Sequence, residues 1–168
     1  MEYGFVLPMG GPMASPEKLT AIAQHAEEKG YSYIAMGDHI AIPWEVESPY
    51  PYAQGGQSPG LSSGWLPRYR PEGQMQYCLE QLTVLAYIAG QTSTIRLLTS
   101  VTILPHRRPV VAAKTLATID LLSNGRLTVG SGAGWMREEF EAIGTEPFDE
   151  RGDVTEEYIR AFKELWTS

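Results

Sequence analysis

The feature that most constrains this chain is a fourfold alternation of strand-like and helix-like apolar patterns. Strands are expected at 3–7, 33–37, 95–104 and 126–130. Helices are expected between residues 16 and 30 and at 75–90, 110–122 and 153–166, with a short one around 138–143. The long connections allow parallel strands with right-handed crossovers. The sequence therefore predicts an α/β fold, closed either as an open doubly wound sheet or as half of an eight-stranded barrel.

Local signals mark the element ends. Ser15 is the expected N-cap of the first helix, with Pro16 at its first position and Gly30 as its stop. Pro109 opens a later helix, which Asn124-Gly125 ends. The segment 95–104 is almost continuously apolar or β-branched, which is typical of a parallel strand covered on both faces.

Length and charge limit the function classes. The 168 residues predict a single domain, whereas a complete (β/α)8 barrel needs roughly 250, so this chain supplies about four βα units. A net charge of −7 argues against nucleic acid as the main partner, because a phosphate backbone needs a basic face. No signal peptide and no run approaching the ~20 apolar residues of a membrane span is visible, so we expect a cytoplasmic protein without a membrane partner.

The chain has one cysteine, which excludes an internal disulfide and a cysteine-based zinc site. Cys78 falls in the apolar pattern of the helix expected at 75–90, and we interpret it as a small core residue, not a nucleophile. No His, Asp and Glu cluster has metal-ligand spacing, so no metal site is expected.

A long irregular stretch covers about residues 43–73. Its six prolines exclude a helix or a central strand. Its interleaved aromatic residues favour an ordered lid over a linker. Trp44 and Trp65 either line the substrate side of a pocket or simply pack the loop down.

Several segments together resemble the luciferase-like monooxygenase family. The resemblance spans essentially the whole chain, in the right order. It rests on Gly37-Asp38-His39, Thr99-Ser100-Val101-Thr102, Leu104-Pro105, Arg108-Pro109, the run from Ala117 to Arg126, Gly130-Ser131-Gly132-Ala133-Gly134-Trp135 and Glu138-Glu139-Phe140.

This resemblance implies a TIM-type barrel of which the chain is the N-terminal half, either as a fragment or as a short relative. It also implies an oxidoreductase that uses FMN or the deazaflavin coenzyme F420 on a small organic substrate. The Gly-Asp-His and Thr-Ser-Val segments favour the deazaflavin branch. The phosphate groups in such barrels sit by strands seven and eight, beyond these residues.

The resemblance also implies site residues. His39 follows the second strand, where barrel active sites are built, and its imidazole is suited to proton transfer. The alternative is a histidine that caps a loop or bonds to Asp38, the second candidate catalytic residue. We expect Asp38 to orient the neighbouring backbone or His39.

The remaining candidates form the cofactor wall. The resemblance implies a bulge at Thr99-Ser100-Val101, with a non-proline cis peptide that supports the ring, where the alternative is an ordinary buried strand. It places Gly132, Gly134 and Trp135 beside the cofactor. The glycines do not fit the dinucleotide pattern G-x-G-x-x-G, and they favour a tight strand-to-helix turn. Some sugar-phosphate dehydrogenases of the family have an acidic glutamate where Trp135 stands, so that proton donor is not transferable.

Two further histidines have simpler interpretations. We expect His25 to be solvated on the first helix, and His106 to lie in a surface turn, with an anion contact as the alternative. Besides the redox enzyme, two functions stay open. One is a non-catalytic half-barrel that assembles through its exposed sheet edges, either into a homo-oligomer or with a separate C-terminal half. The other is a metal-dependent hydrolase built on Asp38 and His39.

Overall fold

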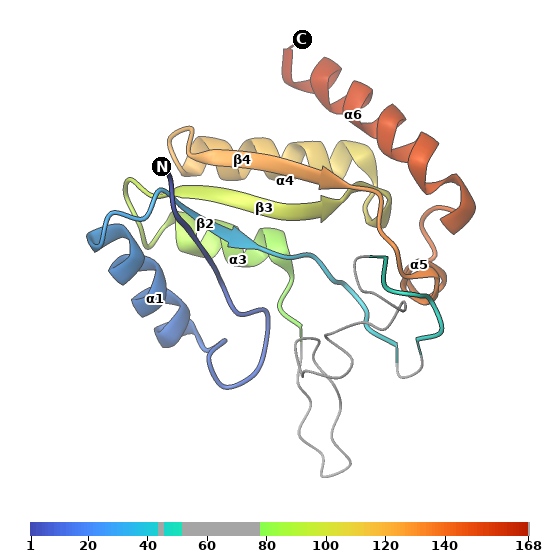
Figure 1. Cartoon of the computed structure of the whole chain (residues 1–168). Helices are drawn as coiled ribbons and strands as arrows, with labels where there is room; N and C mark the ends of the chain where they lie inside the picture. Colours follow the sequence, from blue (N-terminus) through green and yellow to red (C-terminus); the bar gives the residue numbers. More distant parts are fainter. Residues whose placement is uncertain (44–45, 52–77, 168) are drawn as a thin grey trace.

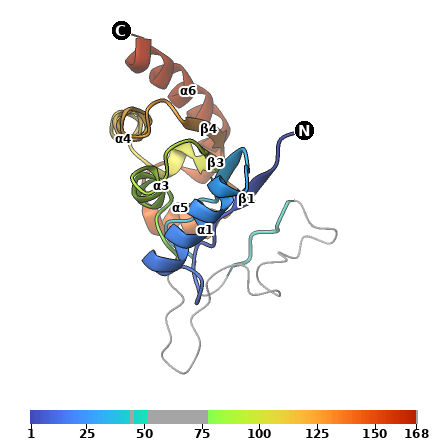
Figure 2. The same cartoon turned by 90° about the vertical axis from the view of Figure 1, so that its left-hand side faces the viewer.

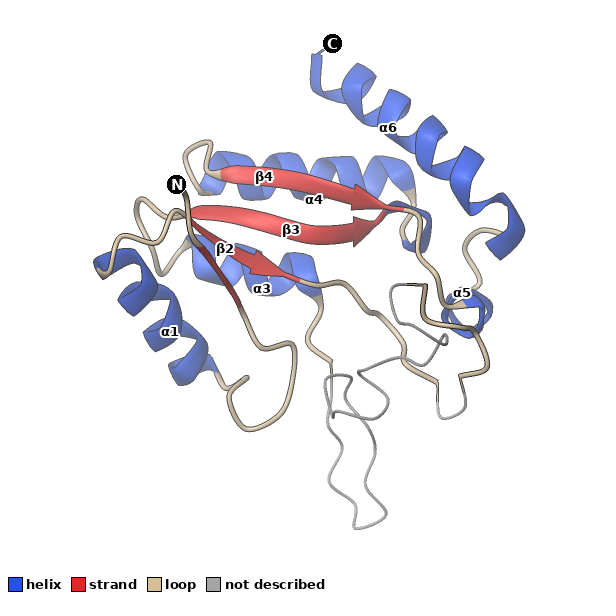
Figure 3. Ribbon diagram, viewed as in Figure 1, coloured by secondary structure: helices blue, strands red, loops and turns tan. Residues whose placement is uncertain are grey.

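The computed structural model describes residues 1–43, 46–51 and 78–167. Most of the lid expected at 43–73, with Trp44 and Trp65, lies outside these residues. Figures 1 and 3 show one sheet with its helices. The strands are β1 (Gly4–Val6), β2 (Tyr33–Met36), β3 (Arg96–Ile103) and β4 (Leu127–Gly132). The helices are α1 (Pro16–Glu28), α3 (Gln81–Ala89), α4 (Pro109–Leu122), α5 (Arg137–Ile143) and α6 (Arg151–Thr167), with 3-10 turns η2 (Leu104–His106) and η3 (Phe148–Glu150).

The order of the strands decides between the two arrangements that the sequence leaves open, an open doubly wound sheet and half of a barrel. The sheet order is β1-β2-β3-β4 and every neighbouring pair is parallel. Figure 2 shows α1, α3 and α4 on the same side of this sheet. Right-handed crossovers that always step to the next strand place all their helices on one face. The arrangement is therefore half of a barrel, and the doubly wound alternative is wrong.

The core lies between this face of the sheet and the helices. Its fully buried members include Ala23, Ile34, Leu85, Ile88, Leu97 and Leu116. On β3, Leu97 and Thr99 are buried whereas Arg96 and Ser100 are exposed. The expectation that this strand is covered on both faces is wrong for the described residues, because all three crossover helices lie on one side. No helix in the described part of the chain is long and apolar enough to cross a membrane.

Local signals set most helix ends as predicted. Ser15 Oγ accepts from the backbone N–H of Lys18 at 3.4 Å, and Gly30 has φ +76°. The start of α3 differs from the prediction. Residues 78–80 are not helical and the helix begins at Gln81, because the Glu80 carboxylate caps it by accepting from the N–H of Thr83 at 2.7 Å.

Two other boundaries move outward. Strand β4 runs through Gly132 instead of stopping at Gly130, and α6 begins at Arg151 rather than near Asp153. All four strands point the same way, so their carboxyl ends meet at one edge, with α5 beside it (Figure 1). That edge is where a barrel of this type carries its active site.

Candidate functional site: a pocket at the carboxyl ends of the strands

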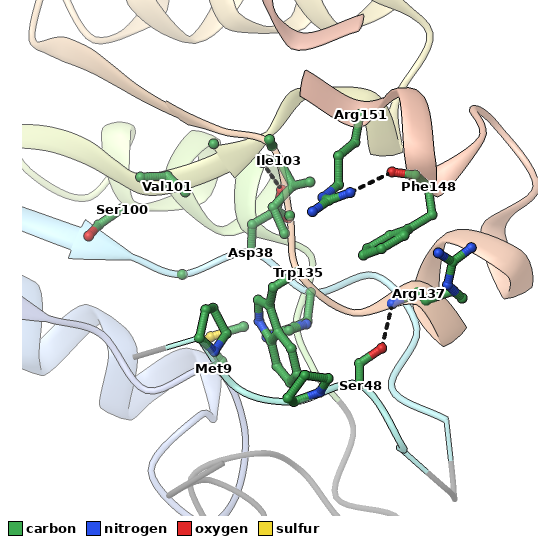
Figure 4. A pocket seen from close by; sticks show the side chains of 17 residues that line it. Met9, Asp38, Ser48, Ser100, Val101, Ile103, Trp135, Arg137, Phe148 and Arg151 are labelled. Atoms are coloured by element: carbon green, nitrogen blue, oxygen red, sulfur yellow. Dashed lines mark hydrogen bonds between the residues drawn. The ribbon is translucent and has the colours of Figure 1, made fainter. Parts of the chain in front are cut away.

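A pocket of about 790 Å³ opens at the carboxyl ends of the strands. It draws residues from the ends of β2, β3 and β4, from the segment 48–51 and from η3 (Figure 4). Seven of the predicted site residues line it, and these are Asp38, His39, Ser100, Val101, Gly132, Gly134 and Trp135. The sequence therefore assigned to one site residues that the fold brings together from three strands.

His39 is held by a carboxylate that sequence reasoning missed. Its Nδ1 lies 2.8 Å from Oε2 of Glu139, and the two side chains are 13% and 1% exposed. An ionised carboxylate only accepts hydrogen bonds, so Nδ1 carries a proton. The protonation of His39 can therefore change only at Nε2.

Glu139 also orders the segment that follows β2. Its Oε1 accepts from the backbone N–H groups of Ile40 at 2.7 Å and Ala41 at 3.1 Å. Burial acts to raise the pKa of Glu139, but the hydrogen bond and charge of His39 outweigh it and, with the Ile40 N–H, hold the pKa below its usual value. The carboxylate is thus ionised at neutral pH and sets the orientation of His39.

The preceding residue, Glu138, acts in the same way further along this segment. Its Oε1 accepts from the N–H groups of Glu47 at 2.7 Å and Ser48 at 2.8 Å. Two adjacent glutamates on α5 thus fix a segment about 90–100 residues away in the sequence. The only sequence signal for these two glutamates was the family resemblance at Glu138-Glu139-Phe140, because no local pattern links residues 138–140 to His39.

Asp38 orients the backbone, as expected, but it does not bond to His39. Its Oδ2 accepts from the N–H of Ile103 at 2.8 Å and from Arg107 at 2.6 Å, and its Oδ1 accepts from Arg107 at 2.8 Å. Arg107 also bonds to Glu80 at 2.6 Å. The carboxylate of Asp38 is thus committed to tying the end of β2 to the end of β3.

One wall of the pocket is the irregular part of β3. The pairing register between β3 and β4 shifts between Thr99 and Thr102, and the Ser100–Val101 peptide is cis, as the resemblance implied. Val101 is 41% exposed and faces the pocket. A Cβ atom placed on Gly132 would lie 2.5 Å from Cγ2 of Val101, so only a glycine leaves this wall flat.

Thr99 does not line the pocket, in contrast to its predicted contact with the cofactor. It is fully buried, and its hydroxyl donates to the carbonyl of Gly130 at 2.8 Å and accepts from the Gly130 N–H at 2.9 Å. The side chain is turned into the sheet by these two bonds. Thr99 therefore supports the wall from behind.

The turn after β4 supplies the second wall. Gly134 has φ +81°, and a Cβ there would lie 2.7 Å from the ring of Phe140, so this position requires glycine. Trp135 follows it, lines the pocket and packs edge-on against Tyr50 at 5.2 Å. Met9 and Trp135 both line the pocket (Figure 4).

Two guanidinium groups lie at the other end of the pocket, and no sequence pattern pointed to them. Arg137 and Arg151 flank the ring of Phe148 at 4.4 Å and 4.0 Å (Figure 4). Arg137 forms an ion pair with Asp149 at 2.5 Å, and Arg151 donates to the carbonyl of Phe148 at 2.9 Å. This end of the pocket suits an anionic group.

His106 is not in a surface turn, and the expectation is wrong. It ends η2, is 3% exposed and packs edge-on against Phe140 at 4.6 Å. Burial lowers its pKa, against the charges of Glu139 and Asp38. His25 is exposed and lies 3.6 Å from Glu28, as expected of a solvated residue.

Cys78 lies ahead of α3 and is half-buried, so its placement in the helix was wrong. Burial, followed by the nearby charges of Glu139, Asp38 and Glu80, raises the pKa of its thiol to about 12. A thiol of this kind is protonated at neutral pH, which agrees with its interpretation as unreactive.

The pocket fits a flat ring with an anionic substituent better than it fits a metal ion. Gly132 and Gly134 carry no side chains of their own, and the space beside them is filled by Val101 and by Phe140 and Ile103, so a planar group would meet the side chain of Val101 with backbone beside it. Within residues 1–43, 46–51 and 78–167, no group of three His, Cys, Asp or Glu side chains is placed to hold a metal ion. That arrangement gives no support to the hydrolase alternative.

Comparison with known proteins agrees with this geometry. The family model described as luciferase-like monooxygenase matches residues 1–168. The chain belongs to the luciferase-like monooxygenase family. An uncharacterised Mycobacterium tuberculosis member is 31% identical over 99% of this chain. The match covers 54% of that relative, so the chain spans about half its length.

Two other relatives have names that state a cofactor. The F420-dependent glucose-6-phosphate dehydrogenase of Amycolatopsis mediterranei is 32% identical over 91% of this chain and 38% of its own length. The FMNH2-dependent dimethylsulfone monooxygenase of Pseudomonas putida is 40% identical over 52% of this chain and 24% of its own length. Luciferase-like proteins of both cofactor types are therefore similar to this chain.

Solved structures of the family share the fold. The monooxygenase RslO1 from Streptomyces bottropensis superposes with a TM-score of 0.70 at 25% identity, over 100% of this chain and 44% of its own. An F420-dependent secondary alcohol dehydrogenase gives a TM-score of 0.70 at 22% identity, over 99% of this chain and 42% of its own, which supports the fold alone. The four described parallel strands, which alternate with helices, are consistent with half of such a barrel.

Proposed function

We propose that this chain forms the ring-binding wall and the proton-transfer site of a flavin- or deazaflavin-dependent oxidoreductase that acts on a small organic substrate. The observation that carries the proposal is the pairing of His39 with the buried Glu139 in a pocket whose opposite wall is Val101 against Gly132. The Amycolatopsis and Pseudomonas relatives, named for F420 and FMNH2, support a cofactor of this class.

The chain's own residues take separate parts in this proposal. The ring would lie against the side chain of Val101 and the backbone of Gly132 and Gly134, which add no side chains of their own to the wall. His39, with Nδ1–H fixed by Glu139, would accept or return a proton at Nε2. When bound, a deazaflavin supplies hydride transfer and a reduced flavin supplies oxygen activation, whereas the protein binds and orients.

Arg137 and Arg151 would meet an anionic part of the cofactor or of the substrate, because both line the pocket. Asp38 would act as a positioning residue, since its carboxylate is already bonded to Arg107 and Ile103. We place Trp135 beside the ring, as the second wall of the site.

The experiment is a titration of the chain with FMN and with F420, followed by fluorescence. Binding of either ring is the expected result, the ring that binds identifies the branch, and binding of neither overturns the proposal. Where turnover with small alcohols, ketones or sulfones is found, His39→Asn should lower it about 100-fold or more without a comparable loss of ring affinity. His25→Asn, on the exposed face of α1, is the matched control and should change neither.

A second candidate function, assembly into a homo-oligomer, is favoured by the sheet edges. Within the described residues β1 and β4 each have one neighbouring strand, and Val6 on β1 is 54% exposed. An apolar groove lined by Leu127, Leu165 and Trp166 follows the β4 side. Two copies could pair β4 with β1 into an eight-stranded ring. Sedimentation that finds only a folded 18.6 kDa monomer would contradict this candidate.

A further inference from the structure

Gln81, the first residue of α3, is a polar side chain buried with no exposed surface. Its Nε2 donates to the carbonyl of Met36 at 2.7 Å and to the carbonyl of Val101 at 3.2 Å. Its Oε1 accepts from the hydroxyl of Thr102 at 2.7 Å. Both amide protons and the amide oxygen are thus used, and the two carbonyls, which only accept, fix which end of the amide faces them.

These bonds occur where the backbone ladder is interrupted. The regular pairing of β2 with β3 ends at Met36 and Thr99, and the register of β3 with β4 resumes only at Thr102. The carbonyls of Met36 and Val101 lie at this interruption, where a buried carbonyl without a donor would be costly. The Gln81 amide takes the place of the missing ladder donor.

Gln81 donates to the carbonyl of Val101 from outside the pocket. The side chain of Val101 lines the pocket, where it forms the wall against Gly132. We propose that Gln81 is a positioning residue, which sets the depth and orientation of Val101 and so determines how closely a flat cofactor ring fits. This inference rests on the proposed function for the identity of the ring. It adds a residue outside the pocket to the machinery that binds it.

The test uses three variants of the same chain. Gln81→Glu keeps the shape and the acceptor for Thr102 but removes both N–H donors, so that at most one carbonyl can be bonded, by a protonated carboxyl group. Thr102→Val keeps Gln81 and its bonds to the two carbonyls but removes the hydroxyl that donates to Oε1. Thr92→Val is the matched control: Thr92 is also a buried threonine, but its hydroxyl bonds to Ile88 and Arg126 at the opposite end of the sheet.

Two readouts are measured for each variant, namely the Kd for FMN or F420 and the methyl NMR signals of Val101 in the cofactor-free protein. Gln81→Glu should weaken ring binding about tenfold, and Thr102→Val should weaken it less, about threefold. Both should shift the Val101 methyl signals. Thr92→Val should lower the melting temperature without changing either readout.

The inference is overturned if Val101 signals stay in place in Thr102→Val and Gln81→Glu, or if Thr92→Val changes ring affinity as much as they do. If Gln81→Glu does not fold, the comparison of Thr102→Val with Thr92→Val in the same two readouts decides whether the inference holds. If the unaltered chain binds neither ring, the proposed function fails. The Val101 signals of the cofactor-free variants then still decide whether Gln81 positions this wall.

Discussion

Replacing Glu139 by glutamine tests whether this buried carboxylate sets the tautomer of His39. In the structure the carboxylate accepts three hydrogen bonds, from His39 Nδ1 and from the N–H groups of Ile40 and Ala41. A glutamine keeps one oxygen for the two backbone donors but presents an NH2 group to the imidazole. His39 must then accept a hydrogen bond at Nδ1. Its proton therefore moves to Nε2, which is the ring nitrogen proposed to exchange protons.

The energetic cost follows from the same three bonds. A hydrogen bond to a charged acceptor contributes about 1.5–3 kcal/mol, and a neutral one about 0.5–1.5 kcal/mol. Losing the charge at the two backbone bonds therefore costs about 2 kcal/mol in the free energy of unfolding. Glu139→Ala also leaves the Ile40 and Ala41 N–H groups unpaired and should cost roughly 4–6 kcal/mol.

The pH dependence has a definite sign. Burial raises the pKa of folded Glu139, but the hydrogen bonds and charges around it, of which those of His39 are the largest, together lower it below the usual 4.5. Its contribution to stability is therefore complete above pH 4.5 and is lost as the pH falls through the folded pKa. The stability difference between the unaltered chain and Glu139→Gln should shrink in acid.

Urea unfolding at pH 7 and in acid measures the stability, and long-range 1H–15N NMR of the imidazole identifies the tautomer. Glu141→Gln, which is exposed on the same helix, is the control and should change neither. The reasoning is refuted if Glu139→Gln leaves the proton of His39 on Nδ1 and alters the free energy of unfolding by less than about 0.5 kcal/mol.

Two further predictions concern the wall of the pocket and the far end of the sheet. Gly132→Ala should weaken ring binding at least about tenfold, because its Cβ would lie 2.5 Å from Val101, whereas Gly152→Ala on α6 meets nothing within 4 Å and should leave Kd unchanged in the same titration. The carboxylate of Glu27 accepts hydrogen bonds from the N–H groups of residues 93–95. Burial raises the pKa of Glu27, but these hydrogen bonds outweigh it and lower the pKa from 4.5 to about 2. Glu27→Gln should therefore cost about 1 kcal/mol at pH 7 after allowance for solvent exposure, and chemical denaturation should show this difference vanishing between pH 4.5 and 2.

The element order was predictable because its signals are local. The helix starts at Pro16 and Pro109 and the stops at Gly30 and Asn124-Gly125 depend on caps and on φ values that single residues favour. A helix start set by a less usual cap was missed, since the Glu80 carboxylate, rather than a Ser or Asp, begins α3. The bulge at Ser100-Val101 was predicted by resemblance, not by spacing.

The sequence by itself determined an alternating α/β chain too short for a whole barrel, with His39 and the glycines of β4 at strand ends. The tertiary structure alone decided that the helices cover one face, that His106 is buried and that Glu139, rather than Asp38, holds His39. The physical reason is the range of the interactions. Caps and periodicity act within a few residues, whereas the His39–Glu139 bond joins side chains 100 residues apart, which only the packed sheet brings within 2.8 Å.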